Sequence, residues 1–131
     1  MNHYERVQRI VDFLEDRLRE TAPLDEAAAA ANLSVPQAYR LFHALAGHTL
    51  GDYQRKRRLS EAALALTASR RTVLDVALEH GFESQEGFTR AFTALTGTPP
   101  GRWRRQPEPR EPFPRLDLPR LYFTRAADRV S

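Results

Sequence analysis

The amino-acid sequence predicts an all-α fold of about seven helices, in which two tandem helix-turn-helix units are joined by a long linking helix. Sliding the sequence on itself aligns residues 24–55 with residues 74–105 without a gap, with eleven identical residues in thirty-two positions. Both copies place a serine, a phenylalanine and two glycines at equivalent positions. Because these residues cap, anchor and end helices, the repeat indicates a duplicated structural unit rather than a chance match of alanine-rich helices.

The first predicted element is an amphipathic helix within residues 4–20. Its apolar residues recur three or four positions apart, so they form one stripe along the helix. We expect this helix to brace the first unit by packing its stripe inward. The stripe consists of Val7, Ile10, Val11, Leu14 and Leu18.

The first helix-turn-helix unit is predicted at residues 24–47. A run of alanines after Leu24 favours its first helix, because alanine loses no side-chain entropy on helix formation. Ser34 is a good cap for the second helix, and Gln37 three residues later completes a capping box. Gly47 then ends the unit, since glycine tolerates the positive φ found after many helices.

The linking helix is predicted at residues 50–68, which contain no proline and repeat apolar side chains on one face. The second unit follows at residues 73–97. Gly81 supplies the turn between its helices, Ser84 caps the second helix, and Gly97 ends it.

Residues 106–131 are expected to be a proline-rich, linker-like tail. Five prolines between Gln106 and Arg120 are incompatible with a regular helix. Residues 121–131 are compatible with a single strand, for which the sequence offers no partner.

The composition argues against several classes of function. The absence of cysteine excludes disulfides and cysteine-based zinc sites. The four histidines lack metal-ligand spacing, and neither paired carboxylates nor a nucleophile with a base is recognisable, so we expect no enzyme activity, metal or cofactor. No apolar run approaches the roughly 20 residues of a membrane span, and the expected location is the cytoplasm.

Positive charge is concentrated in the middle of the chain. Residues 34–105 contain eleven Lys or Arg and six acidic residues, a net charge of +5, while the whole chain carries +3. A basic surface favours a polyanionic partner, and a helix-turn-helix unit places its second helix in the major groove of double-stranded DNA. A GC-rich genome would also enrich arginine, so charge alone does not identify the partner.

Each second helix begins with side chains suited to reading bases. Arg pairs with guanine, Gln with adenine and Glu with the cytosine amino group. A lone surface Arg is more often solvated or ion-paired, but here the same Arg follows the same cap in both units. The outward positions are Val35, Pro36, Tyr39 and Arg40 in the first unit and Gln85, Glu86, Thr89 and Arg90 in the second.

Basic residues at the start of the linking helix and its counterpart in the second unit are predicted to contact DNA phosphates, which adds affinity without reading sequence. Tyr53 and Trp103, which interrupt these stretches, are expected in the core. The predicted phosphate contacts are Arg55, Lys56, Arg57, Arg58, Arg102, Arg104 and Arg105.

Residues 3–105 resemble the DNA-binding domain of the AraC/XylS family of bacterial transcription regulators, and within it the branch of small, freestanding multidrug and oxidative-stress activators. The resemblance rests on "GHTLGDYQRKRRLSEAALAL" and on "VALEHGFESQEGFTRAFTALTGTPPGRWRR", which contains the family pattern A-x3-GF, F-x-R-x-F and G-x-x-P. It implies a monomer that binds an asymmetric DNA site through two recognition helices in successive major-groove segments, and an activator that also contacts RNA polymerase.

The resemblance assigns base contacts to Pro36, Tyr39 and Arg40 and to Glu86, Gly87 and Arg90. Relatives often have an aromatic residue in place of Pro36 and Gln in place of Glu86, so the sequence preference is expected to differ. Gly87 fits either a close approach to DNA or tight packing between helices. Two alternatives are a helical protein-interaction module and the truncated DNA-binding half of a longer ligand-responsive regulator, because the tail resembles the opening of an effector-binding domain.

Overall fold

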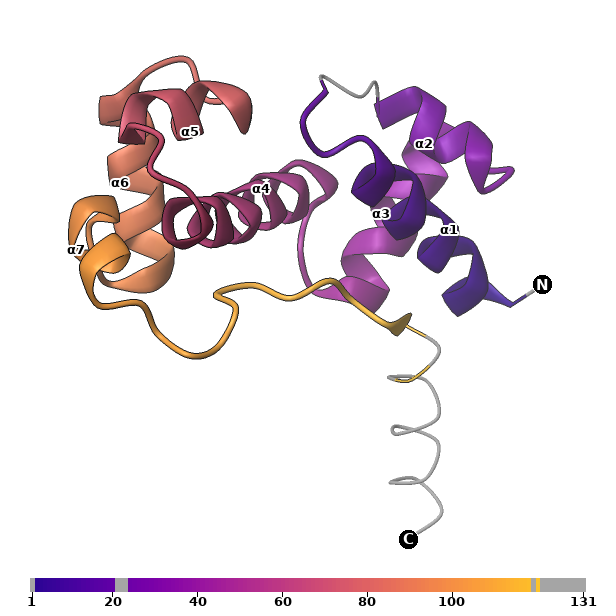
Figure 1. Cartoon of the computed structure of the whole chain (residues 1–131). Coiled ribbons are helices and arrows are strands. Elements are labelled where there is room, and N and C mark those ends of the chain that lie inside the picture. The colour runs from indigo at the N-terminus through magenta and orange to yellow at the C-terminus, as the bar shows by residue number, and fades with distance from the viewer. Residues whose placement is uncertain (1, 21–23, 119, 121–131) are drawn as a thin grey trace, which may run out of the picture. The chain divides into compact units, whose positions relative to one another are not determined.

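The computed structural model describes residues 2–20, 24–118 and 120, and every regular element within them is a helix (Figure 1). This confirms the all-α prediction with its long linking helix. The strand predicted for residues 121–131 lies outside the described residues. The helices are α1 His3–Asp16, α2 Leu24–Ala30, α3 Val35–Ala46, α4 Leu50–Ala68, α5 Val73–Glu79, α6 Gln85–Thr96 and α7 Pro100–Arg105.

The chain divides into two compact units, and the division falls within α4. Unit 1 contains α1, α2, α3, the first residues of α4 and residues 115–118. Unit 2 contains the rest of α4, α5, α6, α7, residues 18–20 and the segment between α7 and residue 114. Each unit therefore holds one of the two predicted helix-turn-helix pairs.

The core of unit 1 forms where α1 packs against α2 and α3. The stripe residues within α1 are buried, namely Val7, Ile10, Val11 and Leu14. Leu18 is also buried, but it follows the end of α1 and belongs to unit 2. Phe42 of α3 meets Tyr53 of α4 edge to face, with ring centroids 5.3 Å apart. Tyr53 is fully buried, as expected from the sequence.

The core of unit 2 is built around the aromatic side chains of α6. Phe92 stands between Phe88 and Trp103, with ring centroids 5.5 and 5.6 Å away. These rings pack on the apolar face of α4, which presents Leu59, Ala62, Ala63 and Leu66. Trp103 is 4% exposed, so its expected place in the core is confirmed.

The predicted caps form as local sequence dictates. The Ser34 side chain accepts from the Gln37 N–H, and the Gln37 side chain accepts from the Ser34 N–H, which is a complete capping box. Ser84 caps α6 by accepting from the Gly87 N–H at 3.0 Å. Gly47 and Gly97 end α3 and α6 at φ values of +75° and +78°, where a side chain would be strained.

The two units differ by one residue in the turn between their helices. The second helices of the two pairs, α3 and α6, correspond with an offset of fifty residues, but α2 and α5 end at Ala30 and Glu79, an offset of forty-nine. The turn residue with a positive φ is Asn32 in unit 1 and Gly81 in unit 2, so these two residues also correspond with an offset of forty-nine. The ungapped alignment is therefore wrong by one residue across α2 and α5.

This offset places His80 where unit 1 has the small residue Ala31, and both are buried. The His80 Nδ1 lies 2.8 Å from the Val76 carbonyl oxygen, which can only accept, so the imidazole proton resides on Nδ1. Nε2 is buried without a partner among the described residues. Desolvation by burial lowers the pKa of His80, and the nearby positive charge of Arg19 adds to this effect.

Candidate nucleic-acid interface

The first turns of α3 present the predicted base contacts of unit 1 to the outside. Pro36 and Arg40 are exposed, and Tyr39 is 38% exposed although it is a large aromatic residue. The opposite face of α3 buries Ala38 and Phe42 in the core. Burial of this face fixes the orientation of the helix, and the capping box fixes where it starts, so the exposed positions are a direct result of local sequence.

The first turns of α6 present a different set of side chains in unit 2. Gln85, Glu86 and Arg90 are exposed, and Thr89 is half-buried. Among the described residues neither Arg90 nor its counterpart Arg40 forms an ion pair, so both differ from a typical paired surface arginine.

Gly87 lies in the first turn of α6, and its surroundings decide between the two interpretations of this glycine. A Cβ atom built there would meet one group within 4 Å, the Ser84 hydroxyl oxygen at 3.2 Å, which belongs to the cap of the same helix. No other helix among the described residues approaches it. The structure therefore provides no tight interhelical packing that would require glycine at this position.

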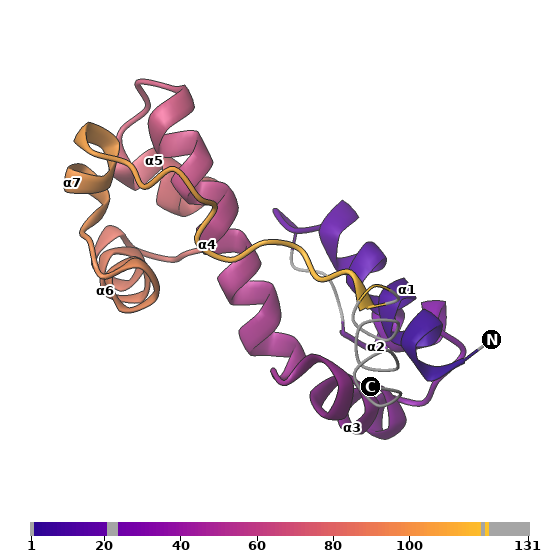
Figure 2. The ribbon, with the colours of Figure 1, turned by 90° about the horizontal axis from the view of Figure 1, so that it is seen from below.

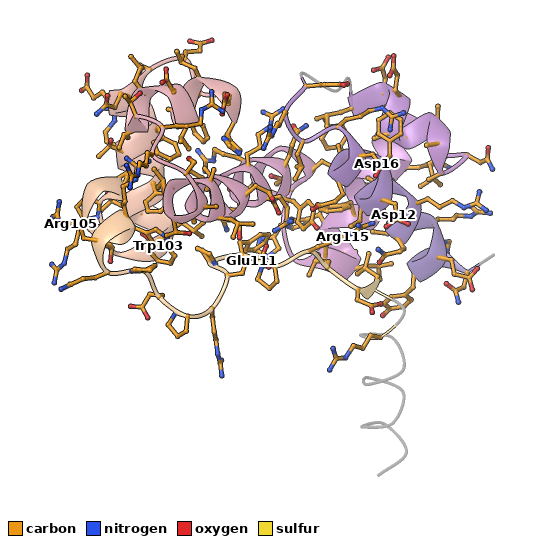
Figure 3. The ribbon with its side chains drawn as sticks, in the orientation of Figure 1. Asp12, Asp16, Trp103, Arg105, Glu111 and Arg115 are labelled. Carbon is orange, nitrogen blue, oxygen red and sulfur yellow. The ribbon has the colours of Figure 1, made fainter. Side chains whose placement is uncertain are left out.

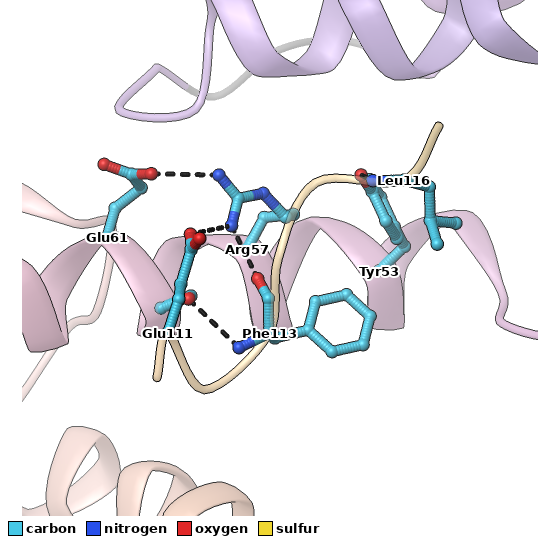
Figure 4. A network of polar contacts seen from close by, with 7 residues as sticks. Tyr53, Arg57, Glu61, Glu111, Phe113 and Leu116 are labelled. Carbon is cyan, nitrogen blue, oxygen red and sulfur yellow. Dashed lines mark hydrogen bonds and ion pairs between the residues drawn. The ribbon is translucent and has the colours of Figure 1, made fainter. Parts of the chain in front are cut away.

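Arg57, which the sequence predicts as a phosphate contact, is buried and paired with protein oxygens. Its side chain is 3% exposed, and its guanidinium pairs with Glu61 at 2.9 Å and with Glu111 at 2.8 Å. It also donates to the Phe113 carbonyl oxygen at 2.6 Å (Figure 4). Two of these acceptors come from the segment after α7, which was expected to be a linker, so nothing near Arg57 in the sequence indicated its burial.

Arg58 and Arg104 also point to protein carbonyl groups rather than outward. Arg58 Nε donates to the Leu18 carbonyl oxygen and Nη2 to that of Glu20, both at 2.6 Å, and burial lowers its pKa. Arg104 Nε donates to the Leu66 carbonyl oxygen at 2.8 Å. Leu66 lies in the last turn of α4, where carbonyls have no partner within the helix, whereas Leu18 and Glu20 lie after the end of α1.

The remaining predicted phosphate contacts keep an outward position. Arg55, Arg102 and Arg105 are exposed, and Figure 3 shows Arg105 pointing away from the helices of unit 2. Lys56 is half-buried, and its ammonium lies 5.7 Å from the centre of the Phe113 ring.

One cation beside α3 was not identified from the sequence. Arg6 of α1 lines a hollow of about 350 Å³ together with Arg40, His3 and Gln37. Two arginines from different helices therefore border the same concave surface next to the recognition helix of unit 1. The signal in the sequence was weak, because residues 1–33 carry more acidic than basic side chains and Arg6 lies outside the repeat.

Other types of site find no support in the part of the chain that the structure describes. No group of three His, Asp or Glu side chains there could hold a metal ion. No helix there is long and apolar enough to cross a membrane.

Relatives of the chain agree with this arrangement. The right origin-binding protein of Escherichia coli K12 is 40% identical over 102 residues, which are 78% of this chain and 35% of that protein. This chain therefore spans about a third of the length of that relative. The multiple antibiotic resistance protein MarA of Salmonella typhimurium is 34% identical over 98 residues, 75% of this chain and 77% of MarA.

Solved structures show the same fold. A transcriptional regulator with an AraC-type DNA-binding domain from Chromobacterium violaceum superimposes with a TM-score of 0.76 at 23% identity, over 80% of this chain and 94% of the other. The DNA-binding domain of AdpA, solved in complex with a target DNA, gives a TM-score of 0.67 at 27% identity, over 79% and 97%.

The family model described as a helix-turn-helix domain matches residues 27–106, which begin within α2 and include α3 to α7. Together with the relatives above, this match assigns the repeat a known family. The chain belongs to the AraC-type helix-turn-helix family of DNA-binding transcription regulators.

Proposed function

We propose that this chain regulates transcription by binding a specific double-stranded DNA site through the exposed first turns of α3 and α6. The observation that carries the proposal is the repeated presentation of one arginine. Arg40 and Arg90 occupy the same position after Ser34 and Ser84, and both are exposed on helices whose other face is buried. The AdpA domain, which has the same fold, was solved in complex with a target DNA.

The base-reading set is proposed to be Pro36, Tyr39 and Arg40 in α3 and Gln85, Glu86, Gly87, Thr89 and Arg90 in α6. The two arginines are suited to guanine, since a guanidinium donates to both guanine O6 and N7. Glu86 repels phosphates and favours a cytosine, whose amino group can donate to the carboxylate. Apart from this arginine, the side chains of the two sets differ in type. This difference supports binding by a monomer to an asymmetric site.

The phosphate-contacting set is proposed to be smaller than the basic stretches suggest. Arg55, Lys56, Arg102 and Arg105 remain in it, and Arg6 joins it because it borders a hollow beside Arg40. Arg58 and Arg104 are omitted because their guanidinium groups bind protein carbonyl oxygens, and Arg57 is not available to a phosphate while it is paired with Glu111. Each cation in the set neutralises about one phosphate and contributes about 0.9 to the slope with which log K falls as log salt rises.

Activation of transcription through contact with RNA polymerase, within the bacterial cytoplasm, completes the proposal. By name, the relatives include an origin-binding protein, a transcriptional regulator and a multiple antibiotic resistance protein. The rival function is a protein-interaction module that keeps the fold without binding DNA.

The decisive experiment is a selection of bound fragments from genomic DNA, followed by titration of the best fragment and a scrambled version at several salt concentrations. We expect tighter binding to the selected fragment and a linear fall of log K with log salt. A protein that binds no fragment at low salt would favour the interaction module.

A further inference from the structure

The proline-rich segment after α7 lies against the basic stretch of α4 within unit 2, as Figures 2 and 4 both show. Arg57 Nη1 donates to Glu111 Oε1 at 2.8 Å and to the Phe113 carbonyl oxygen at 2.6 Å. The Phe113 N–H donates to Ser60 Oγ at 3.1 Å, and the Phe113 ring lies 5.7 Å from the Lys56 ammonium. The segment thus contacts two cations that the sequence predicted as phosphate contacts.

The oxygens around Arg57 resemble those of a phosphate group in their chemistry. A carboxylate oxygen of Glu111 and the carbonyl oxygen of Phe113 accept from the same guanidinium nitrogen, and Glu61 accepts from the other. A guanidinium also donates to phosphate oxygens, which are charged acceptors like a carboxylate oxygen. A phosphate and the Glu111–Phe113 segment are therefore alternative ligands for Arg57.

The Glu111 side chain is 46% exposed, so water competes for its ion pair with Arg57. A hollow of about 390 Å³ lies beside the segment, lined by residues 107–112 together with Ala63, Leu64 and Trp103.

We propose that the Glu111–Phe113 segment is an autoinhibitory contact that competes with DNA phosphates for Lys56 and Arg57. This inference rests on the proposed DNA-binding function. In the free protein the segment neutralises Arg57 with a carboxylate and covers Lys56 with a ring. When DNA binds, a phosphate replaces Glu111 and the Phe113 carbonyl on Arg57, and the segment leaves α4. Weakening the segment raises DNA affinity.

The test uses the full chain with Glu111→Gln and a matched control, Glu108→Gln. Both variants remove one negative charge from the same segment. Glu111 forms an ion pair with Arg57, whereas Glu108 forms none with the described residues. We expect Glu111→Gln to bind DNA roughly two- to fivefold more tightly than Glu108→Gln, the range of a partly exposed ion pair. Equal affinity of the two variants would overturn the proposal.

Hydrogen exchange of the Phe113 amide in the wild-type protein is an independent readout that needs no mutation. This amide donates to Ser60 Oγ in the free protein, so DNA binding should make its exchange faster. Unchanged or slower exchange in the DNA complex would mean that the segment only stabilises the fold. If the wild-type protein and Glu111→Gln both bind no DNA, the proposed function itself fails, which is a different result.

Discussion

Arg104 closes the end of α4, because its Nε donates to the carbonyl oxygen of Leu66 at 2.8 Å and its Nη2 donates to the carbonyl oxygen of Arg71. Leu66 lies in the last turn of α4, where carbonyls have no partner within the helix. An arginine that looks like a DNA contact in the sequence therefore serves the fold of unit 2.

This relationship predicts that Arg104→Ala lowers the stability of the fold, whereas Arg105→Ala weakens DNA binding. Arg104→Ala should lower the free energy of unfolding by roughly 1 to 2 kcal/mol, because it leaves carbonyls without a charged donor. Arg105→Ala should leave stability within about 0.5 kcal/mol of wild type but reduce the salt slope of DNA binding by about 1. Chemical denaturation and salt titrations measure both. The assignment is wrong if the two variants exchange these effects.

Arg90→Ala is predicted to reduce sequence specificity. The variant should lose roughly 1 to 3 kcal/mol of binding free energy on the selected site and relax the preference at one base pair. Binding to scrambled DNA should change far less. Arg102→Ala is the matched control, since loss of a phosphate contact weakens both DNAs alike. Equal losses of Arg90→Ala on both DNAs would place Arg90 among the phosphate contacts instead.

Gly87→Ala is predicted to weaken DNA binding while leaving the fold nearly intact. Alanine favours a helix interior by about 1 kcal/mol over glycine, and the new Cβ displaces the Ser84 hydroxyl by only a small distance. The free energy of unfolding should therefore change by less than about 1 kcal/mol. A loss of DNA affinity at unchanged thermal stability would establish close approach of the α6 backbone to DNA. Retained affinity would contradict it.

Arg6→Ala is predicted to weaken binding to all DNA sequences, since Arg6 borders the hollow beside Arg40. The salt slope should fall by about 1, as for the loss of one phosphate contact. Arg9→Ala is the control, because Arg9 is exposed on the same helix but does not line the hollow. If both variants behave alike, Arg6 contributes only general charge.

His80 predicts a stability that declines on acidification. Its pKa is lowered in the folded protein by burial, while the unfolded chain titrates near the ordinary value of about 6.5. The unfolded state therefore binds a proton that the folded state does not. Neutral His80 contributes fully to the free energy of unfolding above about pH 6.5. This contribution is lost as the pH falls below that value, by at most about 1.4 kcal/mol per pH unit. The pH dependence of the free energy of unfolding between pH 4 and 8 should differ between wild type and His80→Leu by up to about one bound proton. Parallel curves for wild type and His80→Leu would contradict the prediction.

Local signals predicted the helices and the exposed faces of α3 and α6 well. Ser34, Ser84, Gly47 and Gly97 act within a few residues of their own helix, so their effect can be read from short sequence windows. The partners of Arg57 are more distant, since Glu111 lies 54 residues away in a segment rich in proline. Neither hydrophobic periodicity nor a helix-capping motif indicates such a long-range ion pair. The same holds for Arg58, whose carbonyl partner on Leu18 is 40 residues away.

The single-residue difference between the two turns has a consequence for the length of the connection. The serine cap and the helix after it correspond with an offset of fifty residues, while the helix before them and the residue at positive φ correspond with an offset of forty-nine. The connection between the paired helices therefore accommodates one residue more or less, while the cap and the buried face of α3 and α6 are kept in both units.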